Sequence, residues 1–447
     1  MGKERDPISD MVRIICNAAL FSITSIILIV NNLFDQYFVT LQEKVQLQAY
    51  TLDVPFYWIM FAAGAGLSAV YSADVSKYLK IGDRVSAEEA AIRALVYSVW
   101  FGMIFSVISF VFMVAVFGIF AERDVAIQAG EYLLPLHIFF FVISLNSVLG
   151  GLLKAEGKHR AYVAALLLML LCNYLFDTLF VKTLGLGLFG NGCGTVCAAA
   201  VSLLFELSFY LRGKTVVKLK MGNYSWSREA ARSAFYKIRT FLIRHITKDL
   251  AELAVRFTIY LAYSLTYGIP MLYSALIATI GLGAGTYLSS EYEKLFVAGD
   301  REGVKKLFVI STVTVMSVTF LLAFIVYFST DILASPFESK STYENMTVMK
   351  WTMGVLAFTA PFVGLRAMAN AVAAPVGRFT NATAMLIVWA SFKVIAVIYA
   401  ADFGYDYIIY VILAERILAA FASLILTFWH LRYNYRRHVV SAQTVRS

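Results

Sequence analysis

Twelve long apolar runs dominate the sequence and constrain its fold more than any other feature. A helix that spans a bilayer needs about 20 mainly apolar residues, and every run reaches this length. The runs cover residues 9–41, 48–79, 88–119, 128–153, 160–182, 189–212, 240–266, 270–296, 304–328, 348–374, 380–401 and 405–432. Period-two alternation is not evident in them, so a membrane barrel is not expected. The sequence therefore predicts an all-α integral membrane protein with twelve transmembrane helices.

The overall composition agrees with this class. With 60% hydrophobic and 15% charged residues, the chain is too apolar for a soluble domain. No cleavable signal peptide is expected, because the first apolar run is too long and no small-residue cleavage site follows it. All four cysteines lie inside apolar runs, so neither a disulfide framework nor a thiol metal site is expected.

Basic residues are distributed unequally between the loops. When alternate loops are assigned to opposite sides, the side with both termini collects most of the Lys and Arg residues. The other side has only Lys44, Arg123, Lys182, Lys340 and Lys350. The positive-inside rule therefore predicts a plasma-membrane protein with both termini in the cytoplasm. This bias accounts for the net charge of +9, which favours an anionic inner leaflet over nucleic acid as the partner.

A long polar segment divides the runs into two groups of six. We predict an N-lobe at 1–212, a cytoplasmic linker at 213–238 with an amphipathic helical portion, and a C-lobe at 239–447. The two lobes share a sequence repeat, since Gly82-Asp83-Arg84 matches Gly299-Asp300-Arg301 with a shift of 217 and later runs match with a shift of 220. An even number of spans in each repeat predicts two lobes related by a pseudo-two-fold axis along the membrane normal.

Polar residues inside the runs of the first half are candidates for function. Asn173 and Asp177 lie one helical turn apart on one face, and a charge at membrane depth costs a few kcal/mol unless it has a role or a partner. Asp35 and Thr195 lie in other runs of the same half. Their oxygens suit a hard cation, whereas two close carboxyls could instead carry a proton. The remaining alternative is that each aspartate only stabilises helix packing.

The chain resembles the multidrug and toxic compound extrusion (MATE) transporters, within the group that also includes polysaccharide and lipid-precursor flippases. The resemblance rests on twelve spans in two halves and on four motifs: Asn32-x-x-Asp35, the Gly-rich end of the second run with its Gly-Asp loop, Asn173-x-x-x-Asp177, and Gly190-Asn-Gly-Cys-Gly194-Thr195. In archaeal members an N-lobe site binds the coupling cation. The resemblance implies that Asp35, Asn173, Asp177 and Thr195 form this site here, for sodium or protons and with no other cofactor. One departure is that residues 8–54 contain no proline, so a proline kink in the first span is not expected.

The repeat also predicts the counterpart of this site. The shifts place Glu252 at the position of Asp35, and Lys393, Val397 and Glu415 at the positions of Asn173, Asp177 and Thr195. Two carboxylates beside one ammonium compensate each other without a metal ion. We therefore predict a structural ion-pair cluster of Glu252, Lys393 and Glu415, which Arg256 could join. A second cation site and a substrate- or proton-binding role for Glu252 are the alternatives.

The predicted function is secondary antiport. Cations entering from outside would drive export of amphipathic, cationic small molecules by alternating access of the two lobes. We expect a monomer with a small-molecule or lipid substrate and no nucleic-acid partner. Flipping of a lipid or lipid-linked saccharide is the first alternative, for which Arg256, Arg366 and Lys393 could provide cationic groups. A membrane enzyme or scaffold is the second, but the histidines are scattered and no catalytic constellation or phosphate-binding Gly-x-x-x-x-Gly-Lys-Ser/Thr loop is present.

Overall fold

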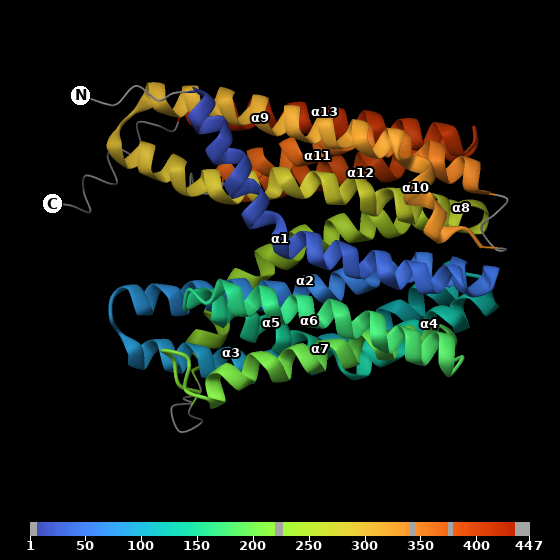
Figure 1. Ribbon diagram of the computed structural model, residues 1–447, viewed down its shortest axis with the longest axis horizontal. Coiled ribbons are helices and arrows are strands. Elements are labelled where there is room, and N and C mark those ends of the chain that lie inside the picture. Colours follow the sequence, from blue (N-terminus) through green and yellow to red (C-terminus); the bar gives the residue numbers. More distant parts are fainter. Residues whose placement is uncertain (1–6, 220–226, 340–344, 374–378, 434–447) are drawn as a thin grey trace. The chain divides into compact units, whose positions relative to one another are not determined.

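The computed structural model describes residues 7–219, 227–339, 345–373 and 379–433, which are helical with short connections and contain no β-strand (Figure 1). Contacts divide the chain into two compact units. We call Val30–Ser264 the first unit, and Met1–Ile29 together with Leu265–Ser447 the second unit. The boundaries therefore fall within two helices, α1 (Pro7–Thr40) and α8 (Arg228–Ala298). The predicted lobe boundaries follow the repeat instead and stay predictions.

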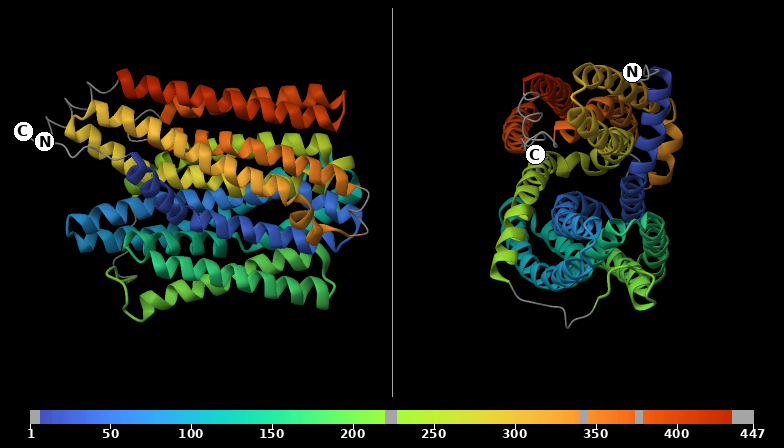
Figure 2. Two further views of the ribbon diagram at one scale, coloured as in Figure 1. Left: turned by 45° about the horizontal axis from the view of Figure 1, so that its top comes forward. Right: turned by 90° about the vertical axis from the view of Figure 1, so that its left-hand side faces the viewer.

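The first unit is a bundle of helices that lie side by side, roughly along the horizontal in the left-hand view of Figure 2. Besides the parts of α1 and α8, it contains α2 (Lys44–Lys80), α3 (Arg84–Phe120), α4 (Arg123–Ile138), α5 (Phe140–Ala155), α6 (His159–Asp177), the π-helix η1 (Thr178–Thr183) and α7 (Gly187–Leu211). Within the predicted run 128–153, α4 and α5 are separate helices with a 54° bend between them. Pro135 lies just before this bend and removes one backbone donor from α4.

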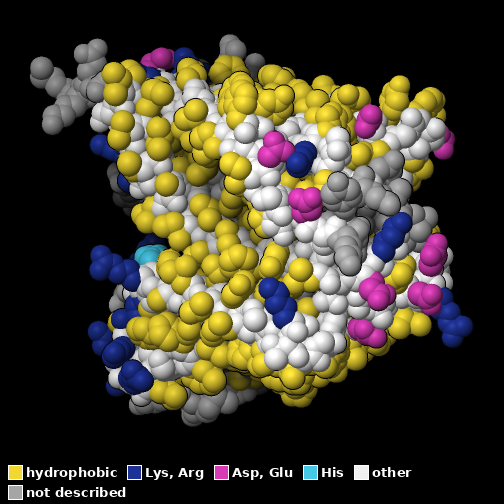
Figure 3. Space-filling view, turned by 45° about the vertical axis from the view of Figure 1, so that its right-hand side comes forward, with side chains coloured by type: hydrophobic (Ala, Val, Ile, Leu, Met, Phe, Trp, Pro, Cys, Tyr) yellow, Lys and Arg dark blue, Asp and Glu magenta, His cyan; other side chains and the backbone are white. Residues whose placement is uncertain are grey.

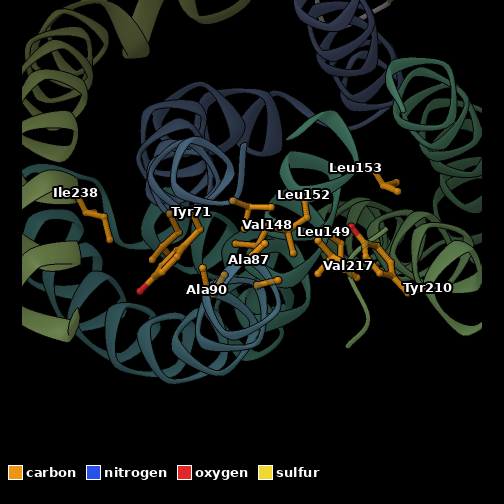
Figure 4. Close-up of a cluster of buried hydrophobic side chains, with 14 residues drawn as sticks. Tyr71, Ala87, Ala90, Val148, Leu149, Leu152, Leu153, Tyr210, Val217 and Ile238 are labelled. Carbon is orange, nitrogen blue, oxygen red and sulfur yellow. The ribbon is translucent and has the colours of Figure 1, made fainter. Parts of the chain in front are cut away.

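A cluster of buried apolar side chains holds one end of the first unit together (Figure 4). Tyr71 of α2, Ala87 and Ala90 of α3, and Leu149 of α5 belong to it. Tyr210 near the end of α7 joins the same cluster. Alanines bring α3 close to its neighbours, as small residues do between helices in lipid. This packing keeps α2 in the interior, where its side chains are mostly buried.

The second unit contains α9 (Arg301–Phe328), the short α10 (Thr330–Ala334) and η3 (Ser335–Phe337), α11 (Met346–Ala373), α12 (Phe379–Ala401) and α13 (Tyr405–Tyr433), with its parts of α1 and α8. Glycines allow these helices to approach closely. A Cβ at Gly281 of α8 would collide with the backbone of Gly364 in α11, and one at Gly283 would collide with the Ala18 carbonyl of α1. The Ser22 hydroxyl also donates to the Thr279 carbonyl at 2.7 Å.

Ten described helical segments are long and apolar enough to cross a membrane, and the bent α4–α5 pair makes an eleventh. The sequence predicts two separate helices at 240–266 and 270–296. The structure differs, because both runs lie within the single helix α8. In the part of α8 whose side chains the structure describes, the later run corresponds to an apolar span, Thr266–Phe296. The earlier run contains five charged residues, which are Arg244, Lys248, Asp249, Glu252 and Arg256.

The two Gly-Asp-Arg loops of the sequence repeat have the same local structure. Gly82 and Gly299 have φ angles of 80° and 74°, a conformation that glycine adopts at little cost. Asp83 accepts a hydrogen bond from the Ser86 N–H at 3.0 Å, and Asp300 accepts one from the Gly303 N–H at 2.8 Å. Each aspartate therefore caps the N-terminus of the helix that follows, so this part of the repeat is structural as well as sequential.

Exposed apolar side chains cover much of the surface. On the face shown in Figure 3, hydrophobic groups predominate, Lys and Arg gather toward the left-hand edge, and most Asp and Glu lie in the right-hand half. Trp100, Val107 and Val111 of α3 are among the exposed apolar residues. Such extensive exposure of large apolar groups is what a lipid environment requires of helix surfaces. The chain is a multi-pass membrane protein.

Candidate cation-binding site

The first part of the site lies near the end of α1, within the first unit. Asn31, Asn32 and Asp35 follow one another at helical spacing, so they share a face of α1. All three are buried, and Asp35 has no exposed surface. Gln36 donates from Nε2 to the Asn32 Oδ1 at 3.4 Å. A polar face this deeply buried must meet polar groups from other helices.

Asn173 of α6 meets Asp35. Its Nδ2 donates to Asp35 Oδ1 at 2.5 Å and to Asp177 Oδ2 at 3.0 Å. Asn173 and Asp177 are also fully buried. The carboxyl groups of Asp35 and Asp177 lie within hydrogen-bonding reach of each other. A single amide group therefore bridges two carboxyls from different helices. The structure thus brings together three of the four predicted cation-site residues.

The backbone of α6 changes directly after Asp177. The next six residues, Thr178–Thr183, form the π-helix η1, where hydrogen bonds span five residues, as in Leu184 N–H to Leu179 O at 2.9 Å. Lys182 of this turn lies over the Tyr37 ring at 4.9 Å and donates to its hydroxyl at 3.3 Å. Single π-helical turns often occur at functional sites, since they re-aim the side chains beside them.

The glycine-rich start of α7 forms the third side. Gly194 lies so close to Asp177 that a Cβ there would collide with Oδ1 of the carboxyl. Asn191 donates from Nδ2 to the Asp35 carbonyl at 3.2 Å. Thr195, the fourth predicted residue, follows Gly194 and is 7% exposed, but its hydroxyl donates to the Asn191 carbonyl at 3.3 Å. It therefore lies next to the site without a hydrogen bond to the carboxyls.

Several buried oxygens of this site have no hydrogen-bond donor among the described residues. They are Asp35 Oδ2, Asn173 Oδ1, Asp177 Oδ1 and Asn191 Oδ1. Carboxylate and amide oxygens are the ligands that hard cations prefer, and unsatisfied carboxyl oxygens equally accept protons. In the described part of the chain, no group of three or more His, Cys, Asp or Glu side chains could hold a metal ion. The two carboxyls and the amide oxygens beside them fit a monovalent cation or a proton.

The residues of the predicted charged cluster form ion pairs with other partners. Glu252 pairs with Arg256 at 3.4 Å within the first unit, and Glu415 pairs with Arg366 at 3.2 Å within the second. Lys393 is half-buried and lies in the second unit. The pairing of Glu252 with Lys393 stays a prediction.

Two features of the site were not expected from the sequence. Asn191 was not recognised as a site residue, although it precedes Thr195 by one turn and belongs to the same glycine-rich stretch. The second feature is a pair of buried tyrosines, Tyr50 of α2 and Tyr132 of α4, whose ring centroids are 5.0 Å apart and whose hydroxyls lie within electrostatic range of Asp35. No spacing within a single run could have identified this contact, because it joins two helices.

Residues 21–179 match the MatE family model. This range includes Asp35, Asn173 and Asp177. No curated protein matches the chain.

Solved structures share the fold over nearly the whole chain. The inward-facing conformation of a multidrug resistance MATE family transporter of the MOP superfamily has 17% sequence identity and a TM-score of 0.80, with 93% of this chain and 96% of that chain covered. An outward-facing conformation has a TM-score of 0.77 at 17% identity, with 97% of each chain covered.

A third similar structure is a MOP superfamily transporter from Pyrococcus furiosus, described as having a binding pocket of reverse polarity that suggests a different function. It has 19% identity and a TM-score of 0.75, with 96% of this chain and 97% of that chain covered. These similarities confirm the predicted all-α, two-lobe membrane fold. The chain is therefore similar to MATE transporters in sequence over residues 21–179 and in fold over nearly its whole length.

Proposed function

We propose that the protein is an antiporter in which inward movement of sodium or protons drives export of amphipathic, cationic small molecules. The observation that carries this proposal is the buried pair Asp35 and Asp177, bridged by the Asn173 amide. Neither carboxyl forms an ion pair with a described Lys or Arg residue. Two buried carboxylates without a paired Lys or Arg side chain need a bound cation or a proton to neutralise their negative charge.

The bridge supports a coupling mechanism within this unit. Asn173 connects α6 to α1, and Gly194 brings α7 against Asp177. A change in the charge of the carboxyls would therefore alter the contacts of three helices at once. If occupation of the site lowers the affinity for substrate, linkage requires that substrate lowers the affinity for the cation equally. We further propose alternating access of the lobes 1–212 and 239–447 about the linker 213–238.

The proposal extends to substrate, orientation and assembly. The 15% aromatic content and 14 methionines suit amphipathic and cationic substrates. We also propose that the protein is a monomer in the plasma membrane. The uneven distribution of Lys and Arg supports an orientation with both termini in the cytoplasm.

Reconstituted efflux of a cationic dye, under sodium and proton gradients imposed separately, tests the proposal. One of the two gradients is expected to drive dye movement. Asp177→Asn is expected to abolish coupling in a folded protein, whereas Asp124→Asn, at an exposed position in α4, is expected to retain it. Coupled efflux by the Asp177→Asn variant would refute the assigned site. Flipping of a labelled lipid without dye efflux would favour the flippase alternative.

We also propose that Glu252, Arg256, Lys393 and Glu415 have a structural role. The ion pairs Glu252–Arg256 and Arg366–Glu415 support this role, because a charge that has a partner needs no ligand. The double variant Glu252→Gln with Lys393→Met is expected to retain dye efflux. Loss of efflux in a folded double variant would instead indicate a second cation site or a substrate site.

A further inference from the structure

Asp53 is a second buried acid in the first unit, apart from the Asp35/Asp177 pair. It lies on α2 and has no exposed surface. Its neighbours in the chain, Leu52 and Val54, are also buried. Neither carboxyl oxygen has a hydrogen-bond partner among the described residues. The structure also gives Asp53 no ion pair within the described part of the chain.

An ionised carboxylate in such surroundings is strongly unfavourable. Either a bound cation or a proton must remove its charge. A hard cation needs several oxygen ligands at once, and in the described residues Asp53 belongs to no group of three His, Cys, Asp or Glu side chains. A proton requires no further ligand. We propose that Asp53 is a second proton-binding site of the first unit.

Among the described residues, no Lys or Arg side chain forms an ion pair with Asp53. The helices α3, α4, α5 and α7 pack against α2, and from them the Tyr132 hydroxyl of α4 lies within electrostatic range of Asp53. Arg256 of α8 donates to the carbonyl of Thr51, two residues before Asp53, at 3.1 Å, but its charge is paired with Glu252. On α2 itself, Tyr50 and Tyr57 lie one helical turn before and after Asp53 and share its helix face.

Tyr132 lies near both the Asp35/Asp177 pair and Asp53. Its hydroxyl lies within electrostatic range of both Asp53 and Asp35, and its ring packs against Tyr50 at 5.0 Å. Neutral hydroxyl groups thus lie near the carboxyls of α1 and of α2. If the protein is the antiporter proposed above, Asp53 provides a second position at which a proton is held during the cycle.

Infrared spectroscopy of purified protein labelled with [¹³C]aspartate tests the assignment without transport. The variant Asp35→Asn/Asp177→Asn lacks the first site. It is expected to retain a protonated-carboxyl band from aspartate at neutral pH, and this band is expected to shift in deuterium oxide. Adding Asp53→Asn is expected to remove the band. The control Asp74→Asn, farther along α2 and partly exposed, is expected to leave it unchanged.

Two results of the infrared experiment would overturn the assignment of a proton to Asp53. Absence of the band from the Asp35→Asn/Asp177→Asn variant would show that Asp53 is ionised and would overturn the proposal, even if the triple variant fails to fold. Persistence of the band after Asp53→Asn would overturn it as well. Neither result depends on efflux, so loss of the antiport proposal would leave this assignment intact, and the reverse also holds.

Discussion

One amide group holds two carboxyls from different helices at the candidate site. Asn173 contributes the bridge through Nδ2, while Asp35 and Asp177 each retain one oxygen without a described donor. Hydrogen bonds from a donor favour the charged form of a carboxylate. In the proposed antiporter, a change at this one residue would therefore alter the environment of both carboxyls.

Asn173→Leu is expected to raise the proton affinity of the pair. The variant loses two hydrogen bonds to carboxyls, each contributing about 1.5–3 kcal/mol when the acceptor is charged. The pH dependence of coupled dye efflux should therefore move upward by about one pH unit or more. Asn146→Leu is the matched control, since Asn146 is a buried asparagine of α5 whose described contact is to Met169 Sδ at 3.8 Å. An unchanged pH profile for Asn173→Leu would contradict the bridging role.

Gly194→Ala is expected to disrupt the site by steric conflict. The added Cβ would collide with Asp177 Oδ1, and overpacking of this kind typically costs about 1–3 kcal/mol. We expect a lower melting temperature and at least about a tenfold loss of coupled efflux. Gly118→Ala on α3 is the control, because a Cβ there meets nothing within 4 Å. Equal behaviour of the two variants would show that close approach of α7 is not required.

At the scale of elements, Pro55 explains how α8 attaches to α2. A proline inside a helix cannot donate to the carbonyl four residues earlier, so the Thr51 carbonyl lacks its usual partner. Arg256 of α8 donates to this carbonyl at 3.1 Å and pairs with Glu252 at 3.4 Å. The carbonyl that Pro55 leaves without a donor in α2 therefore accepts a hydrogen bond from a charged side chain of α8.

Arg256→Met is expected to destabilise the first unit, because it removes the ion pair with Glu252 and the hydrogen bond to the Thr51 carbonyl. Breaking a buried ion pair typically costs about 3–5 kcal/mol. In a Pro55→Ala background the cost should be smaller, since the new backbone N–H can donate to Thr51. Thermal unfolding in detergent measures both effects.

Arg93→Met is the control for this cycle. Arg93 pairs with Glu89 at 3.0 Å on the same helix, and both side chains are partly exposed. Such pairs contribute about 1 kcal/mol or less, so a small change in melting temperature is expected. An Arg256→Met cost that is the same with and without Pro55 would show that the carbonyl contact contributes nothing.

At the scale of the whole molecule, the equivalent Gly-Asp-Arg loops predict the topology. Because they occupy equivalent places in two parallel repeats, both should lie on one side of the membrane. In a variant without the four native cysteines, Arg84→Cys and Arg301→Cys should react with an impermeant thiol reagent only from the cytoplasm. Glu122→Cys, at the opposite end of α3, should react only from outside. Labelling of Arg84→Cys and Arg301→Cys from different sides would contradict the parallel repeat.

Particular residues show how far sequence reasoning reaches. Asn173 and Asp177 were identified because their spacing defines one helix face. Asp53 was missed, since its burial and lack of partners depend on the helices around α2. The repeat indicated Glu415 as a charged position, but its partner Arg366 lies 49 residues away, and several cationic residues were available as partners.

The sequence by itself determined the fold class, because lipid forces backbone polar groups to be satisfied within helices and the apolar runs are long enough for such helices. It also determined the repeat and the helix faces that carry Asp35, Asn173 and Asp177. Only the tertiary structure decided that Asn173 bridges both carboxyls, that Gly194 meets Asp177, and that α8 continues through two predicted spans. The reason is geometric: periodicity defines a face within one helix, whereas contacts between helices depend on how they rotate and cross.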